Sequence, residues 1–145
     1  MSDTKQTQVK ISGSCACGKV RFTAKSAPTD TTYCYCTQCR KSSGAAFIAF
    51  TDFRKDQIEW LGPPDEWKSS SIAQRTYCST CSSCIAMLYD AYPDDIWITL
   101  GCIDEGIELV PKVAHCIFVS EKPEWAETPA GVRCFDKWSV SSTSS

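Results

Sequence analysis

Histidine is almost absent from this sequence, and so are the long apolar runs of membrane proteins and the apolar stripes of helical proteins. His115 is the only histidine, so any imidazole that acts as a general acid or base must be this residue. The longest uncharged apolar stretch, 44–50, is far too short to cross a bilayer. No run of residues carries the apolar stripe of a long amphipathic helix. The sequence therefore predicts little helix and no membrane-spanning segment.

The charge of the sequence is nearly balanced, which excludes another large class of partners. Fifteen Lys and Arg residues against 17 Asp and Glu residues give a net charge of −2, spread evenly along the chain. Such a surface lacks the basic stripe that a phosphate backbone requires. The opening segment MSDTKQTQVK also lacks the apolar run of a secretory signal. We therefore expect a cytoplasmic protein that binds a small molecule rather than nucleic acid or a membrane, and its oligomeric state stays open.

What the sequence does contain is the composition and the turn pattern of a small β domain. Its 145 residues suit one domain, and 5 Trp, 5 Tyr and 6 Phe can fill a core. Short runs rich in β-branched and aromatic residues alternate with turns that contain Pro and Asp. These runs predict strands at 9–12, 20–24, 31–35, 46–50, 58–61, 72–77, 85–89, 96–100 and 113–119. The predicted domain is mostly β and covers residues 9–137, with one helical turn at 41–45 and flexible tails at 1–8 and 139–145.

Cysteine is the most informative residue type, because 11 of the 145 residues are Cys. A reducing compartment disfavours structural disulfides, and an odd number fits complete pairing poorly. Metal ligation is therefore the leading interpretation, with disulfides as the alternative. Cys102, Cys116 and Cys134 stand alone and are expected to be small buried residues rather than ligands.

The other eight cysteines form three clusters along the chain: Cys15 and Cys17; Cys34, Cys36 and Cys39; and Cys78, Cys81 and Cys84. Residues two apart on a strand face the same side, so each C-x-C pair is expected to chelate from a strand. The C-x-x-C of Cys78 and Cys81 suits a tight zinc-knuckle turn. Ligand counting then predicts two zinc sites. Cys15, Cys17, Cys78 and Cys81 close one tetrahedral site, while Cys34, Cys36 and Cys39 leave a position open unless Cys84 or another cysteine fills it.

An open zinc site is the usual arrangement for catalysis, whereas a closed site is usually structural. Zinc held by three thiolates has a net charge near −1, so it activates water poorly and prefers a soft fourth ligand. A substrate thiol can supply that ligand and lose its proton beside an electrophile. The open site therefore predicts chemistry that makes or breaks a carbon–sulfur bond.

The order of these residues resembles the glutathione-dependent formaldehyde-activating enzyme (GFA) family, also named for centromere protein V. The segment from His115 to Trp125 is similar to the family's C-terminal stretch. Two positions depart from the pattern. Tyr35 stands where family members often have His, and Ser82 stands where they usually have Gly. The resemblance is carried by Gly13-x-Cys15-x-Cys17-Gly18-x-Val20, by Cys34-x-Cys36-x-x-Cys39-Arg40-Lys41-x-x-Gly44 and by Tyr77-Cys78-x-x-Cys81.

The resemblance implies a mostly β, Mss4-like fold, a sandwich or tent built around zinc sites. The founding activity of the family is the formation of S-(hydroxymethyl)glutathione from formaldehyde and glutathione. Glutathione is therefore the first-choice thiol. The resemblance also implies one structural and one catalytic zinc per chain, with the same partition of ligands that counting gives: Cys15, Cys17, Cys78 and Cys81 for the structural ion, and Cys34, Cys36 and Cys39 for the catalytic one.

Residues outside the cysteine clusters supply further candidates. Arg40 follows the last ligand of the open site and could bind a carboxylate of glutathione as a bidentate pair, with a solvated charge or a partner of a thiolate as the alternative. His115 is a candidate for proton transfer, with a purely structural role as the alternative. Tyr35 lies between two ligands and is expected to pack. The five Trp residues are expected in the core or in a pocket wall.

The combined prediction is a zinc-dependent carbon–sulfur lyase with Cys34, Cys36, Cys39, Arg40 and His115 at its catalytic site. Two alternatives stay open. The first is a Lewis-acid lyase, hydrolase or isomerase recruited to a biosynthetic pathway, which acts on a larger metabolite without glutathione. The second is a zinc scaffold without catalytic activity that binds another protein, and a Cys84 that fills the open position would favour it.

Overall fold

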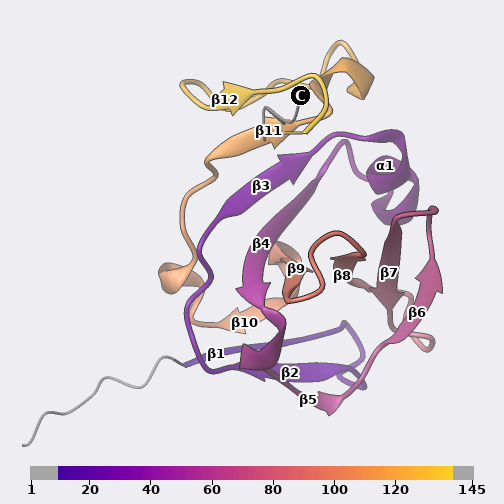
Figure 1. Ribbon diagram of the computed structural model, residues 1–145, viewed down its shortest axis with the longest axis vertical. Coiled ribbons are helices and arrows are strands. Elements are labelled where there is room, and N and C mark those ends of the chain that lie inside the picture. Colours follow the sequence, from indigo (N-terminus) through magenta and orange to yellow (C-terminus); the bar gives the residue numbers. More distant parts are fainter. Residues whose placement is uncertain (1–9, 139–145) are drawn as a thin grey trace, which may run out of the picture.

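In the computed structural model, which describes residues 10–138, the chain folds into two β-sheets and one short α-helix (Figure 1). The mostly β, single-domain fold predicted from the sequence is confirmed. Val9, the first residue of the predicted domain, and the predicted tails at 1–8 and 139–145 lie outside the described residues.

The smaller sheet has four strands within the described residues, in the order β10-β1-β2-β5, and each neighbouring pair is antiparallel. Ile11, Phe22 and Ala24 are buried and alternate with less buried neighbours, as the two-residue period of a strand requires. This sheet lies at the bottom of Figure 1. Its strands are β1 (Ile11–Ser14), β2 (Arg21–Ala24), β5 (Ile58–Gly62) and β10 (Ile103–Glu105).

The larger sheet has eight strands in the described part of the chain, in the order β12-β11-β3-β4-β9-β8-β7-β6. Its neighbours are antiparallel except around β11, which runs parallel to both β3 and β12. The strands are β3 (Thr31–Cys34), β4 (Ile48–Arg54), β6 (Asp65–Lys68), β7 (Ala73–Tyr77), β8 (Cys84–Tyr89), β9 (Asp95–Thr99), β11 (His115–Ile117) and β12 (Arg133–Cys134).

The helix α1 (Thr37–Ser43) follows β3 almost directly and has defined ends. Cys36 is its N-cap, and Gly44 ends it with φ 73° and an N–H bond to the carbonyl oxygen of Arg40. The helical turn predicted at 41–45 is therefore the C-terminal part of a longer helix. Short 3₁₀ segments occur at η1 (Lys55–Gln57), η2 (Leu100–Cys102), η3 (Ile107–Leu109) and η4 (Val119–Glu121).

The two faces of the eight-stranded sheet have different surroundings. Phe53, Ile96 and Ile98 form a buried core together with residues of the four-stranded sheet. Asp52 and Trp97 lie directly opposite each other on β4 and β9, and the alternation of side chains turns them to the other face. A second buried cluster forms on that face, beside a cavity. One face of the sheet is therefore structural, and the other is free to build a site.

Every predicted run overlaps an observed strand, because each run carries the apolar pattern that a sheet buries. The sequence analysis missed β6, β10 and β12. All four residues of β6 and both residues of β12 are exposed, so neither strand has an apolar alternation to detect. These strands form where a neighbouring strand offers unpaired backbone groups.

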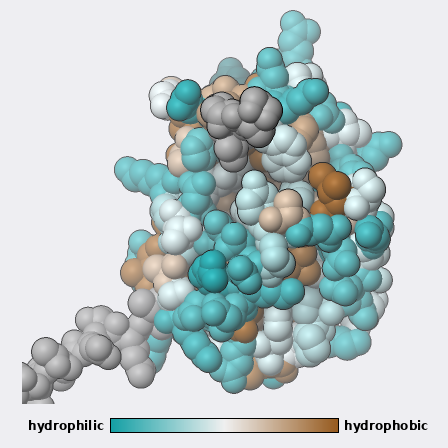
Figure 2. All heavy atoms as spheres, viewed as in Figure 1, coloured by the Kyte–Doolittle hydropathy of each residue, from teal (hydrophilic) through white to brown (hydrophobic). Residues whose placement is uncertain are grey.

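The face of the molecule seen in Figure 2 is mostly hydrophilic, with hydrophobic residues scattered over it. The expected burial of the Trp residues is wrong for Trp125, which is 77% exposed. Trp67 is half exposed but lines a small cavity. Within residues 10–138, no helix is long and apolar enough to cross a bilayer.

The packing of β1 against its neighbours depends on Gly13. A Cβ atom at this position would clash with the carbonyl oxygen of Cys102 and with the ring of Phe22. We expect Gly13→Ala to lower the free energy of unfolding by about 1–3 kcal/mol, the usual cost of overpacking. Gly101→Ala is the control, because the same atom there meets nothing within 4 Å. Urea unfolding measures both variants, and equal stability would contradict this account of β1.

Candidate functional site

Four cysteine sulfurs meet where the loop between β1 and β2 touches the loop between β7 and β8. We call Cys15, Cys17, Cys78 and Cys81 the four-cysteine group, and their sulfur atoms all lie within 4.8 Å of one another. Cys17 Sγ is 3.6 Å from Cys15 Sγ and 3.7 Å from Cys78 Sγ. A tetrahedral zinc with Zn–S bonds of ~2.3 Å places its sulfurs roughly 3.8 Å apart. The donor set therefore fits a closed zinc site.

The loops of this group are tight turns rather than strands. The N–H of Gly18, which has φ 82°, donates to the carbonyl oxygen of Cys15 at 3.1 Å. The expected strand placement of Cys15 and Cys17 is therefore wrong, because the chain reverses here to enter β2. The turn predicted at Cys78 is confirmed: the N–H of Ser82 donates to the Cys78 carbonyl at 2.8 Å. Ser82 has φ 66°, the left-handed conformation that suits glycine.

Polar contacts around the four-cysteine group stabilise thiolates. The N–H of Val20 donates to Cys15 Sγ at 3.2 Å. Ser83 Oγ accepts the N–H of Ala16 at 3.0 Å and lies 3.1 Å from Cys81 Sγ. Hydrogen bonds from the Ser83 hydroxyl and amide lower the pKa of Cys81 to about 5. The group thus ties a loop of the four-stranded sheet to a loop of the eight-stranded sheet.

A second set of sulfurs lies on the other face of the eight-stranded sheet. We call Cys34, Cys36 and Cys39 the three-cysteine group, and their sulfurs also lie within 4.8 Å of one another. Cys34 ends β3, Cys36 caps α1 and Cys39 lies in the first turn of the helix. The expected strand placement of Cys36 is wrong, because the helix begins immediately after it. The cap itself brings sulfurs together, since the Cys39 N–H donates to Cys36 Sγ at 3.3 Å.

Hydrogen bonding within the three-cysteine group concentrates negative charge on one sulfur. Bonds from the Cys34 and Cys39 thiols and from the Cys39 amide outweigh burial and lower the pKa of Cys36 to about 2. The same sharing of protons, with burial, raises the pKa of Cys34. Cys36 is therefore the sulfur of this group that loses its proton first. A donor set with one preformed thiolate fits a metal cation.

The charge of the three-cysteine group is balanced by a residue that the sequence analysis missed. Arg75 of β7 is 6% exposed, and its Nη2 donates to Cys39 Sγ at 3.3 Å. Burial lowers the pKa of this guanidinium, but the charge and hydrogen bond of Cys39, together with the charges of Cys36 and Tyr89, outweigh burial and leave the pKa raised. A charged residue at an inward-facing position of the predicted strand 72–77 is the signal that could have found it.

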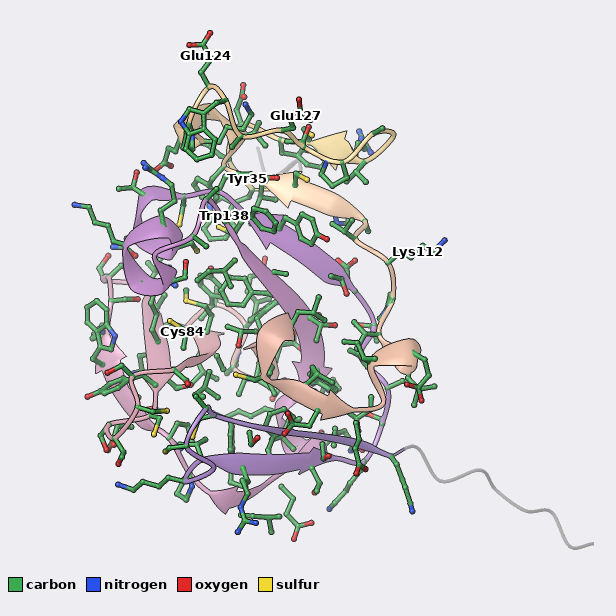
Figure 3. All side chains as sticks on the ribbon, turned by 180° about the vertical axis from the view of Figure 1, so that it is seen from behind. Tyr35, Cys84, Lys112, Glu124, Glu127 and Trp138 are labelled. Carbon is green, nitrogen blue, oxygen red and sulfur yellow. The ribbon has the colours of Figure 1, made fainter. Side chains whose placement is uncertain are left out.

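Cys84 belongs to neither group (Figure 3). Its thiol donates to the carbonyl oxygen of Ser42 at 3.0 Å. Cys102 and Cys116 are buried, as predicted. The prediction is wrong for Cys134, which is exposed next to Cys116 on the edge strand β12. All the cysteines are free, and the second group consists of three sulfurs rather than four.

Arg40 directly follows Cys39, and His115 lies two residues before Ile117, which pairs with Cys34; neither side chain bonds the sulfurs of the three-cysteine group in the described part of the chain. Arg40 Nη2 donates to Thr37 Oγ1 at 3.3 Å, within α1. His115 begins β11, and its Nδ1 lies 3.4 Å from Asp30 Oδ2. The expected packing role of Tyr35 is confirmed: the side chain is fully buried and its hydroxyl donates at 3.2 Å to the backbone of the segment that carries Glu127 (Figure 3).

A cavity of about 660 Å³ lies beside the three-cysteine group. Cys34, Phe50 and Trp97 line it from three neighbouring strands. Tyr89 and Trp138 line another side. The volume is typical of sites that bind small molecules. The cavity therefore gives a small molecule access to Cys34.

These features define a class of protein: a small, mostly β domain with one cysteine group that joins its two sheets and another that borders a cavity. The family model described as glutathione-dependent formaldehyde-activating enzyme matches residues 10–121. The chain belongs to this family, and the resemblance inferred from the cysteine motifs is confirmed.

Similar proteins occur in distant organisms. A Halomonas elongata protein, whose name assigns it provisionally to the same enzymes, is 28% identical over 144 residues, and the match covers 86% of each chain. An uncharacterised lyase of Schizosaccharomyces pombe is 24% identical over 112 residues, 77% of this chain and 80% of the relative. A crystal structure of a Rhodobacter sphaeroides protein matches 65% of this chain and 88% of its own with a TM-score of 0.55 and 18% identity, which supports the fold alone.

Mutation should separate the roles of the two cysteine groups in a protein that we expect to hold two zinc ions. The four-cysteine group joins distant segments, so Cys78→Ser should lower the thermal midpoint strongly and remove one zinc. Cys36→Ser should remove the other zinc and keep most of the stability. Elemental analysis and thermal melts measure both effects. Equal losses of stability would mean that both groups are structural, and one zinc in the unmutated protein would refute the second site.

Replacing Arg75 tests whether it balances the thiolates. We expect Arg75→Met to weaken zinc binding at the three-cysteine group by about ten- to a hundredfold, the usual effect of removing a partner of a metal ligand. Competition with a chromophoric chelator measures the affinity. Arg21→Met is the control, because Arg21 is exposed on the other sheet. If Arg75→Met keeps the affinity of the unmutated protein, the thiolates do not need this charge.

Proposed function

We propose that this protein makes or breaks a carbon–sulfur bond in a small thiol adduct. In this proposal the three-cysteine group holds a catalytic zinc and the four-cysteine group a structural one. The observation that carries it is the convergence of three sulfurs beside a cavity, while the Cys84 sulfur bonds elsewhere. Membership of an enzyme family and a relative named as a lyase support an enzyme rather than a scaffold.

The residues of the chain set the conditions for this reaction. Zinc bound to the three-cysteine group supplies a position that favours the deprotonated form of a thiol. Arg75 offsets the negative charge, and the burial of Cys34 and Cys39 limits the access of water to their sulfurs. In the adding direction the thiol gives up its proton, its sulfur bonds to a carbonyl carbon and the carbonyl oxygen takes a proton. The reverse direction releases thiol and carbonyl, so no oxidant or reductant is needed.

Arg40 is proposed to bind a carboxylate of the substrate, and His115 is proposed to transfer a proton. Arg40 follows Cys39 on α1, and its Nε is buried without a hydrogen-bond partner among the described residues, so it can bind a carboxylate of glutathione. His115 shares a strand face with Ile117, which lines the cavity. Its imidazole lies next to Asp30, two positions before the residue paired with Cys34, and is the group proposed to hold or move a proton of the substrate.

One feature of the cavity favours a second candidate function. Its lining includes the four carboxylates of Asp30, Asp52, Asp90 and Asp95. Glutathione carries more carboxylates than ammonium groups, so these side chains repel it. The second candidate is a zinc-dependent Lewis-acid lyase, hydrolase or isomerase that acts on a larger metabolite without glutathione.

Cobalt substitution separates the two candidates. If the thiol proposal is right, titrating glutathione into the cobalt protein should change the thiolate-to-metal charge-transfer and ligand-field bands. Arg40→Ala should weaken this effect by about ten- to a hundredfold, the range expected for one charge-assisted contact. S-methyl glutathione, which has no thiol, is the control and should leave the spectrum unchanged. Spectra that ignore glutathione would reject the thiol proposal in favour of the second candidate.

A further inference from the structure

The cavity beside Cys34 has an aromatic wall. Tyr92, Trp97, Tyr89 and Trp138 follow one another along it, and neighbouring rings meet edge to face with centroids 5.9, 5.1 and 5.4 Å apart. The four rings therefore form a continuous aromatic surface along the cavity. The faces of aromatic rings carry negative charge density and attract cations.

The charges in the cavity have one sign. Four aspartates line it, and no Lys or Arg of the described chain is among the lining residues. Asp30 and Asp95 each have a basic partner: His115 Nδ1 lies 3.4 Å from Asp30 Oδ2, and Arg54 Nη1 lies 4.0 Å from Asp95 Oδ1. Burial and the neighbouring carboxylates raise the pKa of Asp52 more than the charge of Arg54 lowers it, and no basic side chain forms an ion pair with Asp52 or Asp90 within the described residues.

Asp52 is the carboxylate that most needs a partner. Its Oδ1 is buried and has no hydrogen-bond partner within residues 10–138. Burial, followed by the charges of Asp95 and Asp30, raises the pKa of Asp52 to about 6. A partly buried carboxylate among like charges is costly unless a cation joins it. The aromatic wall extends to Asp52, because Trp97 lies directly opposite Asp52 on the neighbouring strand.

We propose that this cavity binds an organic cation, a substrate whose protonated or quaternary amine lies between the Asp52 carboxylate and the aromatic wall. The carboxylates attract the cation, and the rings of Trp97 and Tyr92 cover the apolar body that carries it. The inference rests on the proposed function only in taking this cavity to be the substrate site. It narrows the second candidate function to amine-bearing metabolites.

The register of the sheet sets the length of such a substrate. Cys34 lies opposite Ile48, and Asp52 lies further along the same strand, β4. From Ile48 to Asp52 a strand rises roughly 13 Å at about 3.3 Å per residue. The substrate therefore lies extended over the sheet, with its reacting group at Cys34 and its cation at Asp52. Formaldehyde alone is too small to span these positions.

Binding of benzyltrimethylammonium to the whole protein tests the proposal, with tryptophan fluorescence and ligand-observed NMR as readouts. Neopentylbenzene is an uncharged compound of the same shape, and phenylmethanesulfonate is an anion of similar size. We expect the cation to bind at least about tenfold more tightly than either. A neutral compound that binds as well as the cation would overturn the proposal, because the cavity would then be merely apolar. Tighter binding of the anion would overturn it as well.

Two substitutions and one control locate the cation. Asp52→Asn keeps the shape and removes the charge, so it should weaken benzyltrimethylammonium about tenfold or more and leave neopentylbenzene unchanged. Asp65→Asn, at an exposed position of β6 outside the cavity, should have no effect. Tyr92→Leu, at a half-exposed position, should weaken the cation by removing one ring.

Unchanged binding of benzyltrimethylammonium by Asp52→Asn would contradict the proposal that Asp52 binds the cation. This outcome differs from a failure of the thiol chemistry, which is measured by the cobalt spectra. A protein that binds the cation through Asp52 while its cobalt spectrum ignores glutathione has the proposed substrate class and a different reaction.

Discussion

The close approach of cysteine sulfurs is the constraint on which the rest of the structure depends. Sulfurs 3.6–3.7 Å apart repel one another as thiolates, and a tetrahedral zinc turns that repulsion into attraction. In the four-cysteine group a bound zinc would tie one loop of each sheet together. The two sheets can then share the core around Phe22 and Ile98. A metal held in the four-cysteine group would supply part of the stability, so the open face of the larger sheet would not need a third layer to cover it.

That open face differs in charge between its two ends. Arg75 lies against the sulfur of Cys39, so the negative charge of the three-cysteine group is compensated from within the protein. At the other end, Asp52 has no such partner among the described residues, and the cavity there stays negative. In the proposed function, this field orients a substrate with one cationic end before it reacts. The walls of Tyr89 and Trp97 restrict it further.

The sequence was sufficient for the class of fold and for the grouping of the cysteines, because alternation and ligand spacing are local signals. It placed Cys78 and Cys81 on a turn correctly, but it wrongly placed Cys15, Cys17 and Cys36 on strands. The reversal after Cys15 depends on Gly18, and the position of Cys36 depends on where α1 begins. The cavity could not be predicted either. Asp52 meets Trp97 only through the register of β4 and β9, which is set by long-range packing.

X-ray absorption at the zinc edge, on protein with both ions bound and no added thiol, tests the central claim most directly. Seven sulfurs in two groups predict an average of about 3.5 sulfur ligands per zinc at ~2.3 Å. The fourth ligand of the zinc in the three-cysteine group should be an atom lighter than sulfur. Cys36→Ser should raise the average of the remaining ion to about four. An average of four sulfurs in the unmutated protein would contradict the account, because it would mean that another cysteine closes the site beside the cavity.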